Sequence, residues 1–426
     1  MSTPSTSRLR LVVLLSVITI VSQFHRSSLS VIAPELVRDL SLTPQMLGLA
    51  GGAFFLALAV AQIPIGVLLD WMGPRRLVAA LTVLAVIGSL ACAAADSGTT
   101  LVLARLLVGL GCGAYFMGAV LMCSRWFTGA RLASALSWVF ALSQIGNLLA
   151  SSPLAAASES IGWRWAFVLA AAGTAAAGIA FWTLVRSDHP APVPAPAAPQ
   201  SLRQTLRGLA DVLRTPGLPN VLAVHTFVYA CVATVLGLWA GPYLHDVHRM
   251  DALARGHVLA AMTLAQFFGM LAFGPLDAWF NTRKWIVVTG GTATVAVLAA
   301  LALIPAPPTG LAVGLLIALC GITSYAVTVV AHGRSLFPDR LLGRGMTTLN
   351  LAQVLGAGAM PLVTGAVAAA LSGPGVAGSV AAGDTFPPHA YRAIFAVMGA
   401  LLAAGLAVYA RGPDARPRPA ASGRRQ

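Results

Sequence analysis

The stretch GVLLDWMGPRR, residues 66–76, joins two apolar runs, and the prediction of the fold starts from it. One run covers 44–69 and the next begins at 76. A membrane-spanning helix needs roughly 20 predominantly apolar residues, so both runs are long enough to cross a bilayer. The turn between them carries Arg75 and Arg76, and basic residues in short loops favour the cytoplasmic side. The sequence therefore predicts two transmembrane helices joined by a cytoplasmic turn.

The same pattern repeats along the chain. Of its 426 residues 58% are hydrophobic and only 9% are charged, whereas soluble domains are about one quarter charged. The apolar runs are long and do not alternate, which excludes a transmembrane β-barrel. We predict an all-α membrane protein with 12 transmembrane helices, over 9–33, 44–69, 76–95, 99–123, 131–155, 162–185, 219–243, 254–276, 284–305, 309–332, 343–371 and 390–410.

The basic residues predict how the chain is oriented. Twenty of the 27 fall on the side of the N-terminus, five fall on the other side, and Arg26 and Arg105 lie within predicted helices. This bias predicts that both termini are cytoplasmic, in a bacterial inner membrane. The net charge of +14 is spread over short clusters between apolar runs. We therefore expect membrane lipids as partners, and no nucleic acid.

The longest polar break, 186–218, divides the helices into two sets of six. It combines an extended Pro/Ala stretch with an amphipathic segment suited to lying on the membrane surface. RWFTGARLASAL (125–136) and SLFPDRLLGRGM (335–346) form a weak repeat, each linking a fourth helix to a fifth. The predicted organisation is a six-helix half (1–185), a cytoplasmic linker with an amphipathic helix (186–218), a second pseudo-symmetric half (219–411) and a disordered basic tail (412–426).

Three motifs give the chain a resemblance to the major facilitator superfamily. Residues 66–76 resemble its loop signature, although Trp71 replaces a basic residue and Pro74 is inserted. RLLVGLGCG, which contains Arg105, and GWRWAF (162–167) also resemble family segments. The resemblance implies the family's fold and a secondary transporter working by alternating access. It also implies a cytoplasmic clasp, so we assign gating roles to Asp70, Arg75, Arg76 and Arg105.

Arg26 is the leading candidate for substrate binding. A charge at the bilayer centre costs about 2.5–3.5 kcal/mol on insertion scales, so this side chain must face the bundle interior. Gln23 and Ser30 share its helical face. Residues 24–48 also have a weak similarity to the organic-anion symporter branch of the superfamily. Arg26 therefore either binds an anionic substrate group, assisted by Gln23 and Ser30, or bonds helix carbonyls and holds the bundle together.

Other polar side chains within predicted helices are also candidates for contact with substrate. Because paired halves place a substrate site between them at mid-depth, corresponding amides in the two halves are of particular interest. Interhelical hydrogen bonding is the alternative role for each. The candidates are Gln144, Asn147, Tyr229, Ser324, Asn350 and Gln353.

No acidic residue is predicted at mid-membrane, which favours an anionic or neutral solute. His225 is then the candidate for proton coupling, because histidine titrates near neutral pH. Its alternative role is a neutral side chain bonded to a backbone carbonyl. We expect a monomeric, proton-coupled importer of a small organic anion, with no cofactor, no metal site and no enzymatic activity. The rival hypotheses are an efflux carrier for amphipathic compounds, a copper carrier and a non-transporting membrane sensor.

Overall fold

A computed structural model describes residues 4–185, 212–372 and 386–417. Helices account for nearly all of these residues, as expected for a chain that must satisfy its backbone hydrogen bonds inside a membrane. The N-terminal part contains α1 (Pro4–Leu40), α2 (Pro44–Met72), α3 (Pro74–Ala93), α4 (Gly98–Trp126), α5 (Gly129–Ser143), α6 (Ile145–Leu149) and α7 (Ser152–Leu184).

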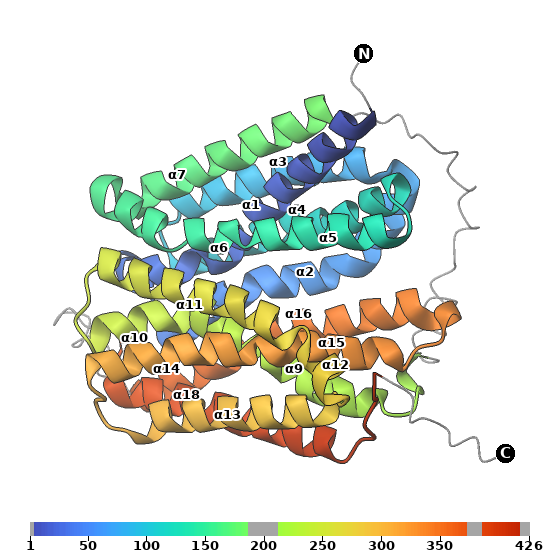
Figure 1. Cartoon of the computed structure of the whole chain (residues 1–426). Helices are drawn as coiled ribbons and strands as arrows, with labels where there is room; N and C mark the ends of the chain where they lie inside the picture. The colour runs from blue at the N-terminus through green and yellow to red at the C-terminus, as the bar shows by residue number, and fades with distance from the viewer. Residues whose placement is uncertain (1–3, 186–211, 373–385, 418–426) are drawn as a thin grey trace.

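The C-terminal part repeats this helical organisation. It contains α9 (Leu218–Thr234), η1 (Val235–Trp239), α10 (Ala240–Asp246), α11 (Ala252–Phe273), α12 (Leu276–Phe280), α13 (Lys284–Leu303), α14 (Thr309–Ile322), η2 (Thr323–Tyr325), α15 (Ala326–Ser335), α16 (Asp339–Ser372) and α18 (Pro388–Ala410). Figure 1 shows the two parts as separate bundles, one above the other, with both ends of the chain toward the same side. We call that side the terminal end, and the other side the distal end.

The number of crossings agrees with the sequence prediction. The described residues contain 11 stretches long and apolar enough to span a membrane, and one of them, Ser134–Leu184, has 51 residues. A single crossing takes roughly 20 residues, and this stretch reverses at Gly162, where φ is 83° and ψ is 154°. A left-handed φ of this kind favours glycine. The described part of the chain therefore makes twelve crossings, and the predicted fold class is confirmed.

Three crossings contain breaks that the sequence analysis did not predict. The fifth is divided into α5, α6 and the first turns of α7, with Gln144 between α5 and α6. The seventh contains the π-helical segment η1, and the tenth contains the 3₁₀ turn η2. Apolar periodicity cannot reveal these changes of winding, because η1 has only five residues and η2 only three. Such irregular segments are frequent at functional sites.

The two halves pack tightly along one side through small residues. A Cβ atom at Gly52 of α2 would overlap the Gly358 carbonyl oxygen of α16, and a Cβ atom at Gly48 would overlap the Pro361 carbonyl oxygen. Helices in membranes approach closely where small side chains permit it. These glycines therefore allow α2 and α16 to contact each other backbone to backbone.

The predicted linker helix lies largely outside the described residues, which resume at 212. Of the tail predicted as disordered, residues 412–417 are described. Asp414 accepts hydrogen bonds from the Thr282 hydroxyl (2.7 Å) and from the backbone N–H groups of Arg283 (3.1 Å) and Lys284 (3.0 Å). Burial alone would raise the pKa of the Asp414 carboxyl, but these hydrogen bonds outweigh it and hold the pKa below its ordinary value. The first residues after α18 are thereby fixed to the start of α13.

Candidate substrate-binding site

A cavity of about 460 Å³ lies between the two halves. The N-terminal half contributes the polar residues Gln23, Arg26, Ser27, Gln144 and Asn147 to its lining. The C-terminal half contributes Tyr229 and Gln266 together with apolar side chains from α9 and η1. No carboxylate is among the described residues that line it. The cavity therefore has one fixed positive charge, surrounded by amides and hydroxyls.

Arg26 connects the halves across this cavity. Its Nη1 donates a hydrogen bond to the Tyr229 hydroxyl oxygen at 3.2 Å, and its guanidinium carbon lies 5.7 Å from the centre of the Phe55 ring. Its Nε is buried and has no hydrogen-bond partner among the described residues. A buried donor without a partner is costly. Arg26 therefore has binding capacity that the described protein groups leave unused.

The amides of the N-terminal half form a short network beside Arg26. Nε2 of Gln23 donates to Oε1 of Gln144 at 2.9 Å, and Nδ2 of Asn147 reaches the same oxygen at 3.4 Å. The Ser27 hydroxyl donates to Oδ1 of Asn147 at 2.8 Å. Gln144 separates α5 from α6 and Asn147 lies in α6, so both amides belong to the break in the fifth crossing and line the cavity. They can exchange these mutual bonds for hydroxyl or carboxylate groups of a solute.

Two candidates lie close to the cavity but have other partners. The Ser30 hydroxyl accepts a hydrogen bond from the Gly241 backbone N–H at 3.1 Å, one turn from Arg26 toward the distal end. The Ser324 hydroxyl donates to the Gln266 carbonyl oxygen at 2.9 Å. Neither residue is among those lining the cavity in the described structure. Ser27 and Gln266 take part in the lining instead, and sequence analysis missed both.

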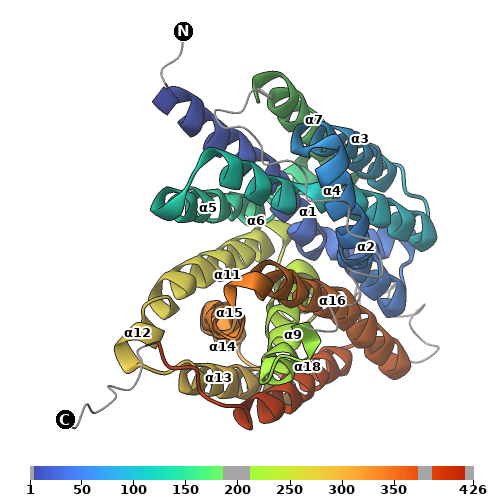
Figure 2. The ribbon, with the colours of Figure 1, turned by 90° about the vertical axis from the view of Figure 1, so that its right-hand side faces the viewer.

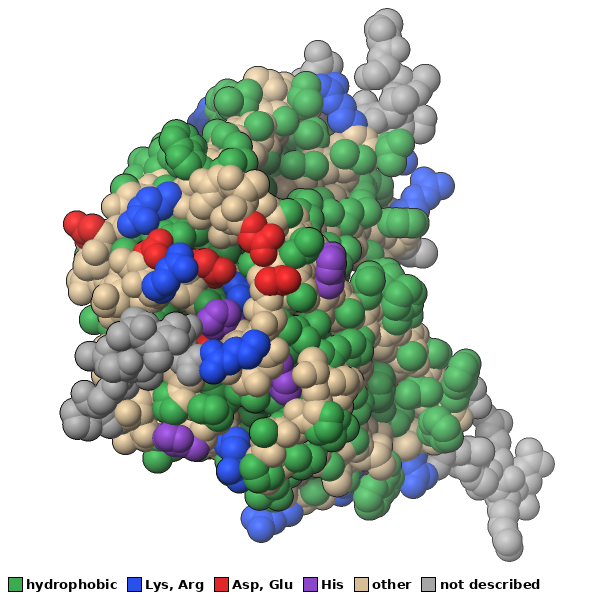
Figure 3. Space-filling view, turned by 90° about the vertical axis from the view of Figure 1, so that its left-hand side faces the viewer, with side chains coloured by type: hydrophobic (Ala, Val, Ile, Leu, Met, Phe, Trp, Pro, Cys, Tyr) green, Lys and Arg blue, Asp and Glu red, His purple; other side chains and the backbone are tan. Residues whose placement is uncertain are grey.

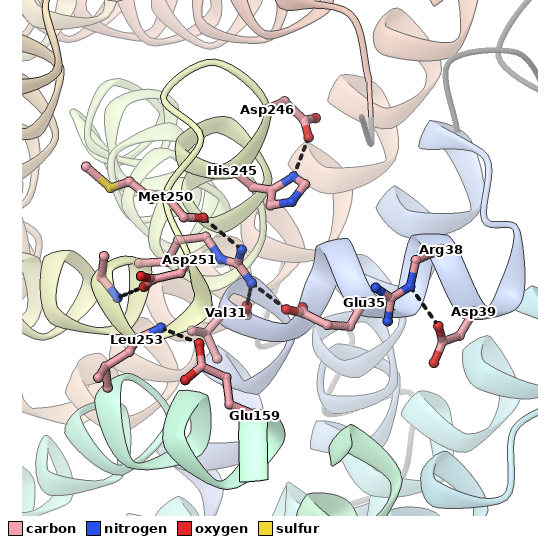
Figure 4. Close-up of polar contacts among 12 residues, drawn as sticks. Val31, Glu35, Arg38, Asp39, Glu159, His245, Asp246, Met250, Asp251 and Leu253 are labelled. Carbon is pink, nitrogen blue, oxygen red and sulfur yellow. Dashed lines mark hydrogen bonds and ion pairs between the residues drawn. The ribbon is translucent and has the colours of Figure 1, made fainter. Parts of the chain in front are cut away.

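The distal end of the bundle is held together by a buried ion pair between the halves. Nη2 of Arg255, on α11, lies 2.6 Å from Oε1 of Glu35, on α1, and also donates to the Val31 carbonyl oxygen at 3.0 Å. The Arg255 side chain is only 2% exposed, whereas that of Glu35 is 23% exposed. Close by, the Leu253 N–H donates to Glu159 at 3.1 Å (Figure 4).

These contacts belong to a wider group of charges. Figure 3 looks onto the distal end and shows acidic and basic side chains gathered there, with apolar side chains predominating elsewhere on this face. Sequence analysis missed the Glu35–Arg255 pair, because the two residues are 220 positions apart in the chain and no spacing rule connects them. We call the contacts of Arg255 with Glu35 and Val31, together with the Leu253–Glu159 bond, the distal gate.

The distal gate depends on a close backbone approach at Gly241. A Cβ atom at this residue would overlap the carbonyl oxygen of Ser30 in the other half. We predict that Gly241→Val prevents closure at this end and lowers the transport rate at least tenfold. Gly173→Val, at a glycine with no atom within 4 Å of a Cβ position, is the matched control. Equal flux for the two variants would show that close approach at Gly241 is unnecessary.

Comparison with known proteins identifies the family. Residues 15–361 match the family model for the Major Facilitator Superfamily, which is most of the chain. The chain belongs to the major facilitator superfamily. It is therefore a multi-pass membrane protein and a transporter, and the resemblance found in the sequence motifs is confirmed.

Several superfamily transporters are similar in sequence. A putative tartrate transporter from Agrobacterium vitis is 23% identical over 328 residues, which cover 70% of this chain and 75% of the relative. A probable L-galactonate transporter from Escherichia coli (strain K12) is 23% identical over 64% of this chain and 63% of the relative. A probable sulfoacetate transporter from Cupriavidus necator is 27% identical over 39% of this chain and 37% of the relative.

Solved structures share the superfamily fold. A bacterial homologue of the human lysosomal transporter Spinster, in an inward-facing and unoccupied conformation, has a TM-score of 0.73 at 19% identity and covers 96% of this chain and 97% of its own. A D-xylose–proton symporter has a TM-score of 0.72 at 13% identity and covers 95% of this chain and 98% of its own. At these identities the likeness establishes the fold.

The superfamily loop signature lies at the terminal end. Nη2 of Arg75 donates to the Trp182 carbonyl oxygen at 2.7 Å, and the guanidinium lies 4.3 Å from the centre of the Trp182 ring. This contact joins α3 to α7 within the N-terminal half. Arg76 is exposed, and the side chain of Asp70 lies outside the described part of the structure. The gating role of this loop stays a prediction.

Arg105 of the superfamily's helix-4 motif is buried to 1% exposure away from the cavity lining. Its Nη1 donates to the His25 carbonyl oxygen at 2.7 Å, and its Nε reaches the Ala50 carbonyl oxygen at 3.4 Å. The guanidinium also lies 5.1 Å from the centre of the Phe54 ring. Arg105 thus connects α4 to α1 and α2, and its contact on α1 is His25, the residue that precedes Arg26.

The predicted symmetry of the amides is not reproduced at the cavity. Gln353 on α16 makes a side-chain hydrogen bond with His225 on α9, and His225 is only 1% exposed. Nδ1 of His225 has no partner among the described residues. Asn350 lies one turn earlier on α16, and neither amide is among the described cavity-lining residues. Gln353 therefore belongs to a separate polar contact between α9 and α16.

Proposed function

We propose that the protein is a secondary transporter that imports a small organic anion across the bacterial inner membrane by alternating access. The observation that supports this most directly is Arg26, the one charged side chain among the described residues of the cavity lining. A guanidinium binds a carboxylate through two parallel hydrogen bonds.

The relatives support an anionic substrate. Tartrate, L-galactonate and sulfoacetate, which appear in their names, are all small organic anions. The first two also carry several hydroxyl groups. In this chain the side chains of Gln23, Gln144 and Asn147 offer amide groups suited to such hydroxyls. We therefore propose a hydroxylated carboxylate as the substrate class.

The orientation follows from the basic residues. The terminal end carries most of the arginines and is assigned to the cytoplasm. The distal gate then closes the side away from the cytoplasm. Alternating access requires this gate to open while contacts at the terminal end form, so the binding site is reached from one side at a time.

The primary test is flux into proteoliposomes that contain the purified protein. We expect accumulation of labelled sugar acids and hydroxydicarboxylates, competition between them, and no uptake of the corresponding neutral sugars. Transport of amphipathic cations, or of copper, in place of these anions would contradict the proposal. A complete lack of flux for every solute would favour the sensor hypothesis.

His225 is the proposed proton carrier. It is buried beside Gln353 and retains a free Nδ1 among the described residues, so a proton could be taken up there during the cycle. We predict that His225→Gln abolishes accumulation driven by a pH gradient and preserves exchange of labelled for unlabelled substrate, which moves no net protons. His257→Gln, at an exposed histidine, is the control. If His225→Gln still accumulates substrate against a gradient, the proton is carried elsewhere.

A further inference from the structure

A second, larger hollow opens at the terminal end between the first turns of α1 and the length of α5, both in the N-terminal half. Its empty volume is about 1180 Å³, and no residue lining it also lines the central cavity. Figure 2 looks onto this end and shows the start of α1 projecting at the edge of the N-terminal half, with α5 below it. We call this hollow the α1–α5 groove.

The groove is basic at its mouth and apolar along its walls. Arg8 and Arg131 lie nearest the helix starts, followed by Leu9, Val13, Trp138 and Leu142. Leu9 is 66% exposed, Val13 is 47% exposed and Trp138 is 61% exposed. Exposing this much apolar surface to water is unfavourable, whereas contact with hydrocarbon is not. These walls therefore suit the acyl region of the bilayer.

The depth of the groove matches the shape of a phospholipid. With a rise of 1.5 Å per residue, Trp138 lies about 10 Å and Leu142 about 16 Å deeper along the helix than Arg131. A headgroup phosphate level with the arginines would place an acyl chain beside Trp138 and Leu142. No carboxylate is among the described residues that line the groove, so nothing in this lining neutralises the two guanidinium groups.

We propose that the α1–α5 groove binds an anionic phospholipid, with its phosphate between Arg8 and Arg131 and one acyl chain along Val13, Trp138 and Leu142. Charge complementarity favours a phosphatidylglycerol-type headgroup over a zwitterionic one, as expected for basic pockets between transmembrane helices on the cytoplasmic side. A bound lipid would fill the space between α1 and α5. The site is independent of the solute that the central cavity carries.

Native mass spectrometry of the purified, full-length protein tests the headgroup preference. Phosphatidylglycerol and phosphatidylcholine of identical acyl chains are titrated separately, and bound-lipid adducts are counted. We expect phosphatidylglycerol to bind at least tenfold more tightly, and Arg8→Gln/Arg131→Gln to remove that preference. The control Arg10→Gln/Arg411→Gln removes the same charge from exposed arginines outside the groove and should change affinity less than twofold. Equal binding of the two lipids to the unmodified protein would overturn the proposal.

Fluorescence quenching tests the acyl position without disturbing the arginines. In vesicles, phosphatidylglycerol with dibrominated chains should quench the protein more than the same fraction of dibrominated phosphatidylcholine. This excess should disappear in Trp138→Phe. Its persistence would place the lipid elsewhere. Glycerol 3-phosphate should not compete with the lipid, and full competition would mean that the groove takes a soluble phosphate. Displacement of the lipid by a second copy of the chain, seen as a doubled mass, would also overturn the proposal.

Discussion

Replacing Arg26 with glutamine is expected to weaken substrate binding by about 30-fold or more and to remove measurable uptake. The reason is that a carboxylate bound in this cavity would lose its counter-charge while still being removed from water. Truncating one partner of a buried, hydrogen-bonded charge pair costs about 2–5 kcal/mol. Glutamine keeps a polar side chain of moderate length, so the change isolates the charge and the geometry of the guanidinium.

The controls for this prediction lie on the same helix. Arg38→Gln removes a charge from an arginine whose side chain is 71% exposed at the distal end, and it should leave affinity within twofold of the unmodified protein. Arg26→Lys keeps the charge but loses the planar two-point donor, so intermediate affinity is expected. Binding is measured by calorimetry in detergent and uptake by proteoliposome flux. Full activity of Arg26→Gln would favour the rival efflux carrier, whose amphipathic substrates need no guanidinium.

The membrane explains why the fold could be predicted so fully. Only helices and closed barrels satisfy their backbone hydrogen bonds inside a bilayer, so long apolar runs identify spanning helices directly. The errors occurred where helices continue beyond the apolar region. The first helix, predicted over 9–33, extends to Leu40 because Glu35 and Asp39 have partners in the folded protein. A prediction from hydropathy ends the helix where charged residues begin, because it does not include the partners that these residues find in the folded protein.

Part of the candidate site could also be predicted. Gln23, Arg26, Gln144, Asn147 and Tyr229 were each selected as polar side chains within a span, and the structure brings all five to one cavity. Their position within a predicted membrane span was enough to select them. Gln266 carries the same signal, a lone amide in an apolar run, and could have been found by the same reasoning.

For the remaining candidates, the sequence did not indicate which side of the helix faces the cavity. Pseudo-symmetry places Asn350 and Gln353 at the depth of the N-terminal amides, but the rotation of α16 directs Gln353 toward His225. The breaks at Gln144 and in η1 also change which face of a helix reaches the cavity. A regular period of 3.6 residues cannot describe side-chain direction across such segments.

Removing the carboxylate of Glu35 is expected to shift the transporter toward the state in which the distal end is open. Glu35→Gln leaves Arg255, which is 2% exposed, without its counter-charge. Breaking a buried ion pair costs about 3–5 kcal/mol, but Glu35 is 23% exposed and Arg255 keeps its bond to the Val31 carbonyl oxygen. We therefore expect a smaller shift of about 1–3 kcal/mol, or roughly 5-fold to 150-fold in the ratio of open to closed states.

Spin labels at Thr99 and Pro305, in exposed positions of opposite halves, would report this shift as a longer distance population. The five native cysteines are all buried, so labelling should be confined to the introduced sites. Asp39→Asn is the matched control, because the partners of Asp39 among the described residues are Arg38, Trp163 and Arg164, all in its own half. An unchanged distance distribution in Glu35→Gln would mean that the Glu35–Arg255 pair contributes equally to both states. Such a pair would stabilise the fold and could not act as a gate, because only interactions that differ between two states change their populations.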